Sequence, residues 1–77
     1  MLTGRRFRLE RPTLALGTEN GKSRAVTVPM GAVIKIVAEP SNGNGMVDVN
    51  WEDRIVEMFA VDVEVRGTEV IDQSTTA

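Results

Sequence analysis

Apolar and polar residues alternate along much of this chain with the period of two that β-strands show. The clearest alternation covers residues 46–52, where every second position is Val or Trp and the positions between are polar. Residues 32–39 form the most apolar segment, with Ile on one face and Val on the other. Two overlapping Asn-Gly pairs at 42–45 separate these segments, and such pairs accept positive φ readily. The pattern predicts an antiparallel meander with a tight reversal at 42–45.

The first third of the chain carries three shorter segments with the same period. Phe7 and Leu9 share one face of a strand that should end near Pro12, because proline removes a ladder donor. Residues 13–16 continue in extended form, and a polar loop with an Asn-Gly turn signal follows at 17–22. A strand at 25–28 then completes the region.

The apolar phase slips in the segment that follows residue 53. Residues 54–59 alternate as a strand, but the valines from Val61 onward fall on the other parity. This slip predicts a bulge or a short helical turn near residues 59–63. The alternative is a helix capped by Asn50, but the branched residues of the segment favour a strand. A last short strand is expected at 68–71.

The 77 residues have room for one domain, which we place at residues 1–71, with a disordered polar tail at 72–77. Hydrophobic content is 42% and aromatic content only 4%, so Val and Ile supply most of the core. Small branched side chains pack well on pleated sheets. We therefore predict an all-β fold, a small barrel of about five to six antiparallel strands with one short helical turn.

Charge is distributed unevenly along the chain. The net charge is −2, yet residues 1–24 carry six basic and two acidic groups, while residues 25–77 carry three basic and nine acidic groups. The basic strip makes four arginines candidates for contacts with nucleic acid: Arg5, Arg6, Arg8 and Arg11. The alternative, which we favour, is a basic strand that neutralises acidic neighbours across the sheet. The acidic remainder of the chain would repel a phosphate backbone.

Several kinds of chemistry lack the residues they need. The chain has no His and no Cys, which removes the commonest general base and the thiolate and imidazole metal ligands. The Gly-rich stretch at 42–45 lacks the Lys-Ser/Thr that a phosphate-binding loop requires. We therefore predict a protein that is not an enzyme, with no catalytic residue, no metal site and no cofactor.

Two predicted strands are apolar on both faces, which is more than one small barrel can bury. The surplus, together with the sole Trp and the acidic turn beside it, gives seven candidates for partner binding: Trp51, Glu52, Asp53, Ile55, Phe59, Val33 and Val37. Trp51 is either a packing residue, the interpretation we favour, or an anchor at a partner surface. The second apolar face is either covered by the N-terminal strand or used for self-association, and both alternatives stay open.

The succession of segments from Val26 to Val70 resembles the SH3-like small barrels. It is also similar to KOW-type and uncharacterised small bacterial barrels, in which a V-x-V-x-W strand precedes a v-x-x-F-x-x-D-l segment. Here the first motif ends at Trp51, and the second contains Phe59 and Asp62. The resemblance implies a fold and no activity. The chain has no Tyr, which argues against the aromatic groove that binds proline-rich peptides.

These observations favour a non-catalytic protein-interaction module or a small structural or regulatory subunit, bound to a protein partner or to itself as a homodimer. The alternative is a nucleic-acid-associated barrel that uses the arginine strip. A third hypothesis is an accessory subunit whose larger partner supplies catalytic groups. No apolar run follows the basic N-terminus and no segment is long enough to cross a membrane, so we expect a cytoplasmic protein without membrane contacts.

Overall fold

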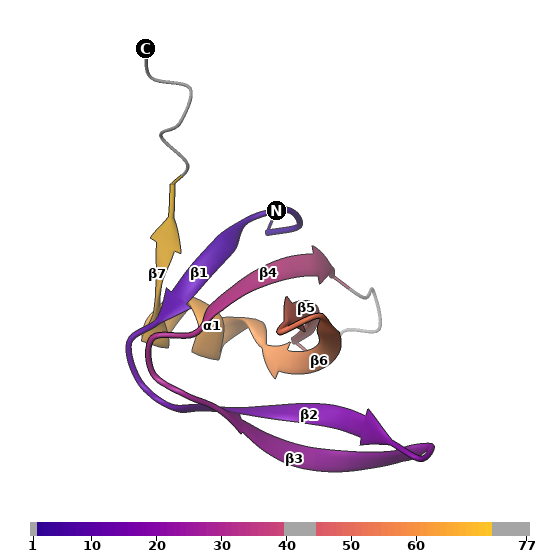
Figure 1. Cartoon of the computed structure of the whole chain (residues 1–77). Helices are drawn as coiled ribbons and strands as arrows, with labels where there is room; N and C mark the ends of the chain where they lie inside the picture. The colour runs from indigo at the N-terminus through magenta and orange to yellow at the C-terminus, as the bar shows by residue number, and fades with distance from the viewer. Residues whose placement is uncertain (1, 40–44, 72–77) are drawn as a thin grey trace.

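The computed structural model describes residues 2–39 and 45–71 as one antiparallel sheet with a short helix (Figure 1). Its strands are β1 (Arg6–Leu9), β2 (Thr13–Glu19), β3 (Lys22–Val28), β4 (Val33–Ala38), β5 (Met46–Trp51), β6 (Arg54–Phe59) and β7 (Gly67–Val70), and its helix is α1 (Ala60–Arg66). Their order across the sheet is β3-β2-β6-β5-β4-β1-β7. The predicted all-β class with one short helical turn is confirmed, and the described residues form seven strands.

The β2–β3 hairpin is longer than the sequence pattern indicated. The segment expected as a polar loop at 17–22 is mostly strand, and only Asn20 and Gly21 turn the chain. Their φ angles of 54° and 77° are those of the tight turn that an Asn-Gly pair favours. Polar residues near this turn stay exposed, so they extend the ladder without entering the core, and the hairpin projects as an arm from the rest of the sheet (Figure 1).

The ambiguous segment after residue 50 is a hairpin and not a helix. β5 and β6 pair from Met46 opposite Phe59 to Trp51 opposite Arg54, with a two-residue turn between them. The phase slip falls where β6 ends and α1 begins at Ala60, and the helix is longer than the turn predicted at 59–63. A buried Val63 fastens α1 to the core.

Gly67 joins α1 to β7 at a point where no larger residue fits. Its N–H donates to the Val63 carbonyl and so caps the helix. A Cβ at this position would lie 2.7 Å from that same carbonyl oxygen, which is closer than real Cβ contacts come. The close approach lets β7 leave the helix directly alongside β1.

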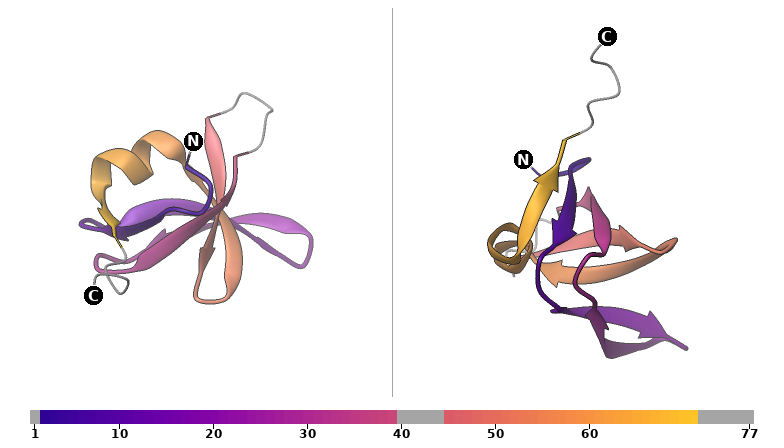
Figure 2. Two further views of the ribbon diagram at one scale, coloured as in Figure 1. Left: turned by 90° about the horizontal axis from the view of Figure 1, so that it is seen from above. Right: turned by 60° about the vertical axis from the view of Figure 1, so that its left-hand side comes forward.

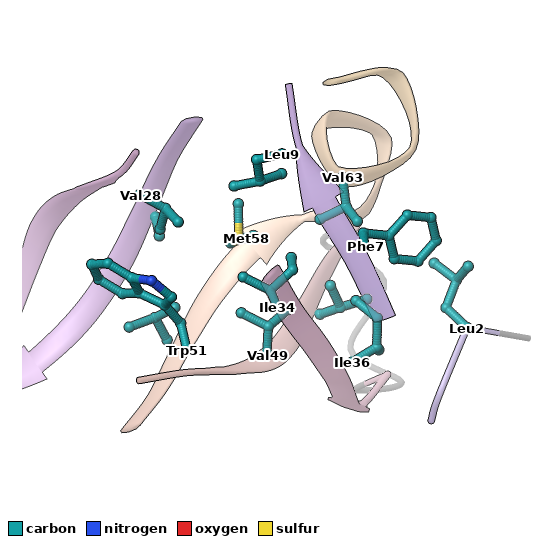
Figure 3. Close-up of a cluster of buried hydrophobic side chains, with 13 residues drawn as sticks. Leu2, Phe7, Leu9, Val28, Ile34, Ile36, Val49, Trp51, Met58 and Val63 are labelled. Atoms are coloured by element: carbon teal, nitrogen blue, oxygen red, sulfur yellow. The ribbon is translucent and has the colours of Figure 1, made fainter. Parts of the chain in front are cut away.

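One core lies inside the curled sheet, with side chains from six strands and α1 converging on it (Figure 3). Its members are Leu2, Phe7, Leu9, Ala15, Val28, Ile34, Ile36, Val47, Val49, Trp51, Val56, Met58 and Val63. Phe7 and Leu9 therefore point inward, at 5% and 0% exposure. The alternative in which the N-terminal strand covers the second apolar face is wrong, because that face stays open to solvent.

The N-terminal residues are tied to the end of β4 by one carboxylate. Glu39 accepts hydrogen bonds from the backbone N–H of Leu2 (2.7 Å) and of Thr3 (3.1 Å). These bonds lower the pKa of the Glu39 carboxyl below its usual value, and the bond from Leu2 contributes most. Leu2 itself is buried in the core, so the tie holds an apolar side chain in place.

The register of β4 with β5 confirms the predicted antiparallel pairing of these strands. Ile36 pairs with Val49 and Ala38 with Asp48, so a bulge at Val37 interrupts the ladder. Most of the predicted Asn-Gly reversal, and the tail predicted at 72–77, lie outside the described residues. No helix in the described part of the chain has the length and apolar character needed to cross a bilayer.

Candidate functional site

The β2–β3 and β5–β6 hairpins diverge from a common crossing (Figure 2, left). β2 and β6 are neighbours in the sheet, but their ladder has one register pair in the described residues, Leu16 with Glu57. Towards the two turns the strands separate, and a cleft of about 430 Å³ opens between them. It is lined by Gly17, Thr18, Glu19, Arg24, Ala25, Val26, Arg54, Ile55 and Val56.

Two arginines bring positive charge to the cleft. Arg24 donates to Glu19 across the β2–β3 hairpin (2.5 Å). Arg54 lies over the ring of Trp51, with its guanidinium carbon 4.7 Å from the ring centre. Such stacking suits a guanidinium, because the ring face carries the negative end of the quadrupole. Arg54 forms no ion pair with the described residues, so its charge is available to a ligand.

The turn beside this cleft is strained. Glu52 and Asp53 have φ angles of 53° and 64°, in the left-handed region that side chains with a Cβ disfavour. The turn needs this shape because Trp51 pairs directly with Arg54. Backbone strain of this kind persists where the surrounding structure holds it, and it is concentrated at functional sites. The strain therefore strengthens this hairpin end as a candidate site.

Four of the predicted partner-binding residues meet at this end of the hairpin. Ile55 lines the cleft and is 52% exposed, and Glu52 and Asp53 form the exposed turn. Trp51 is only 7% exposed and packs in the core, as its favoured interpretation predicted. The Trp ring is thus a support for Arg54 and not an exposed anchor.

Phe59 lies at the other end of β6, in an exposed row on the outer face of the sheet. It is 45% exposed and pairs with Met46 of β5. Leu14 and Phe59 each lie two positions from the Leu16–Glu57 pair, on the side away from the turns, and the described residues show no ladder pair between them. Leu14 is 55% exposed and shares this outer face. We call Leu14, Phe59 and Ile55 the outer-face row.

Val33 and Val37 lie elsewhere, on the outer face of β4. Both are exposed, and Val33 pairs with Arg8 of β1. Next to it, Arg6 pairs with Lys35, so two cations stand side by side in the ladder. Like charges in this position destabilise a sheet. Among the described residues neither Arg6 nor Arg8 forms an ion pair, so the expected neutralisation of the N-terminal strand does not extend to them.

The predicted arginine strip divides among three environments. Arg5 binds Glu69 of β7 through two bonds of 2.8 and 2.5 Å and lies near the ring of Phe7. Its hydrogen bond lowers the pKa of the Glu69 carboxyl. Arg11 lies in the loop after β1, beside Arg66 of α1 in a shallow depression. Of the four arginines, only Arg6 and Arg8 share one open face.

Comparison with known proteins adds no family to this picture. No family model, curated protein or solved structure matches the chain. The site must be interpreted from its own geometry.

The sequence pattern missed several residues of this site. It predicts a short strand at Leu14 without marking that residue as a contact, and it does not single out the arginines of the cleft. Their meeting depends on where two non-adjacent hairpins diverge, which no local pattern encodes. Gly17 was expected in the loop at 17–22, but it lies inside β2, where a glycine permits a close approach. Its Cβ would lie 3.4 Å from Val26 and 3.7 Å from Val56.

Proposed function

We propose that this chain is a non-catalytic protein-interaction module that pairs with a second copy of itself through the outer-face row. The observation that carries the proposal is the exposure of Leu14, Phe59 and Ile55 on one face of β2 and β6. Clusters of exposed apolar side chains of this kind are typical of interaction surfaces. The absence of His and Cys supports a binding role over a catalytic one.

A second copy is the partner that needs no further component. Symmetric dimers use one surface patch twice, so a dimer would bring this row against the same row of its copy. Aromatic residues near the centre of such patches contribute most of the affinity. Phe59 is the only aromatic side chain in the row and pairs in the ladder with Met46. We therefore expect it to contribute most to the contact.

Light scattering on the wild type and on Phe59→Glu tests this proposal. Wild type should have twice the mass of one chain at high concentration, and Phe59→Glu should be a monomer with an unchanged circular dichroism spectrum. Val33→Glu is the matched control, because Val33 is also an exposed apolar residue on a strand but lies outside the row. A monomeric wild type, or a Phe59→Glu variant that remains dimeric, would contradict the proposal.

The second candidate function is association with nucleic acid through the outer face of β1 and β4. The paired cations Arg6 and Lys35, with Arg8 beside them, favour it, since none of the three forms an ion pair with a described residue. Binding to a phosphate backbone should weaken steeply with salt.

A fluorescent single-stranded oligonucleotide, titrated by anisotropy at two salt concentrations, checks this candidate. The Arg6→Gln/Lys35→Gln variant should lose binding. Arg5→Gln should retain most of it, because Arg5 is already neutralised by Glu69. Binding by the double variant at the wild-type level would exclude this face.

We also propose that the sheet belongs with the SH3-like small barrels. The order of one strand, a long hairpin, one strand, a second hairpin, a helical turn and a closing strand supports this assignment. Small secreted domains usually rely on disulfides, because their cores alone contribute little stability. The lack of cysteine in this small domain therefore agrees with a reducing, cytoplasmic location.

A further inference from the structure

We propose that the cleft between β2 and β6 binds an extended acidic peptide, which adds as a strand between the two hairpins and places a carboxylate against Arg54 and Arg24. This site adjoins the outer-face row, with which it shares Ile55, and it goes beyond the self-association proposed above. The cleft volume of about 430 Å³ falls within the range of about 300–1,000 Å³ that is usual for ligand pockets.

The backbone geometry favours a strand as the ligand. The two residues that flank a two-residue turn close the hairpin with mutual backbone hydrogen bonds. Along each strand the backbone N–H and C=O groups of successive residues then point alternately towards the partner strand and away from it. Glu19 and Gly17 thus bond to β3, which leaves the backbone N–H and C=O of Thr18 directed at the cleft. The same rule leaves the backbone groups of Ile55 directed at the cleft from β6.

Thr18 and Ile55 also face each other. The register of Leu16 with Glu57, continued by two residues towards the turns, makes them opposite positions. The described residues show no ladder pair between them, and both line the cleft that opens where the two hairpins diverge (Figure 2). An extended peptide that enters the cleft meets unpaired strand edges on both sides, which is the basis of strand addition.

The side chains around the cleft indicate which peptide fits. Its inner wall is formed by Gly17, Val26 and Val56, and it is apolar and closely packed, since the two valine side chains lie 3.4 and 3.7 Å from the position of a Gly17 Cβ. Arg24 and Arg54 lie on the same face of their strands as Val26 and Val56, nearer the turns. A peptide residue that points inward is therefore apolar at one position and acidic two positions away.

The positive charges of the cleft favour an acidic residue in the peptide. Among the described residues that line the cleft, Glu19 is the only acid, and it already pairs with Arg24. Arg54 is held over Trp51 with no carboxylate from the described residues. A guanidinium in a partly enclosed site binds a carboxylate through short, charge-assisted hydrogen bonds. Arg54 is the main charge contact, and Arg24 adds to it.

The test is an NMR titration with the blocked peptide Asp-Thr-Val-Thr-Asp, whose symmetric sequence suits either strand direction. The amide signals of Thr18 and Ile55 should shift and saturate. The fluorescence of Trp51, the sole tryptophan, should change in parallel as Arg54 turns to the peptide. The isosteric peptide Asn-Thr-Val-Thr-Asn should bind at least about ten-fold more weakly.

Variants separate the cleft from the rest of the surface. Arg54→Gln should weaken binding about ten-fold. Gly17→Leu should abolish it, because the added side chain would extend from the inner wall into the cleft. Arg8→Gln, which removes an exposed arginine on β1, is the matched control and should bind as wild type does. Phe59→Glu should also bind normally, since Phe59 lies outside the cleft.

Two results would overturn the proposal. One is the absence of saturable shifts at Thr18 and Ile55 up to about 1 mM peptide. The other is equal affinity for the acidic and the amide peptide, or for wild type and Arg54→Gln. Gly17 has an ordinary φ, but if Gly17→Leu does not fold, Arg54→Gln still decides the outcome, because Arg54 is exposed and outside the core.

Discussion

The β2–β3 and β5–β6 hairpins both reverse through two residues, but they are stabilised by different parts of the sequence. Asn20 and Gly21 are the residue types that such a turn favours, and the strands beyond them are mostly exposed. Glu52 and Asp53 are poor choices for the same shape, yet their strands supply five core residues. One hairpin is held by its turn, and the other by its packing.

The difference explains how a strained turn survives. Burial of large apolar side chains stabilises by about 1.5–3 kcal/mol each, while a disfavoured φ costs about 1–2 kcal/mol. The β5–β6 hairpin therefore retains its shape against its own turn residues. The strands of the β2–β3 arm are mostly exposed and gain less from burial, so a favourable turn contributes more to the stability of that hairpin. The cleft therefore has the well-packed β5–β6 hairpin on one side and the weakly packed β2–β3 arm on the other.

Removing packing from the β5–β6 hairpin should have the largest effect. Met58→Ala leaves a cavity at a fully buried position and should lower the free energy of unfolding by about 2–5 kcal/mol. Urea denaturation followed by circular dichroism measures the loss. Ser23→Ala, at an exposed position of the arm, should change stability by less than about 0.5 kcal/mol. Equal losses would show that the arm also supports the core.

Damaging the turn of the arm should have a smaller and local effect. Gly21 has a φ of 77°, and the space that a Cβ would occupy there is open, so Gly21→Ala adds backbone strain and no clash. We expect a loss of about 1 kcal/mol, confined to the arm. Faster amide exchange in Lys22–Val28, with unchanged exchange in β5, would verify it. A matching acceleration in β5 would contradict the local origin of the effect.

Relieving the strained turn should stabilise the whole domain slightly. Glu52→Asn with Asp53→Gly installs the residues found in the other turn, and the expected gain is about 0.5–1 kcal/mol. The urea midpoint should rise. A fall would mean that the two acidic side chains make contacts that outweigh the strain.

Sequence reasoning succeeded where local pattern and tertiary packing agree. The alternation in β5 and the phase slip at Phe59 located strands and helix correctly, because burial follows that period. It placed the β2–β3 loop wrongly, because exposed polar residues extend a ladder without any apolar signal. The cleft was beyond its reach, since Arg24 and Arg54 are brought together by the divergence of two hairpins.

Acid should weaken the attachments outside both hairpins, by the smallest amount. The pKa of Glu39 and that of Glu69 are lowered in the folded protein, by hydrogen bonds from Leu2 and Arg5 respectively. Their contribution is therefore complete above the ordinary carboxyl pKa and is lost as pH falls through the lowered values. Because Glu39 is exposed and the Glu69 side chain is still 29% exposed, the effect is modest.

Urea midpoints measured between about pH 6 and pH 3 should show this loss. The Glu39→Gln/Glu69→Gln variant should start lower and depend less on pH over that range. A variant with the same pH dependence as wild type would place the acid sensitivity elsewhere.

Native-state hydrogen exchange tests the contrast between the two hairpins most directly. The compared amides are those of Arg24 and Val26 in the arm and of Val49 and Val56 in β5 and β6, which all face a paired strand. The account predicts that the arm amides exchange through a local opening of low free energy, while Val49 and Val56 exchange only with global unfolding. Equal protection of both hairpins would contradict it.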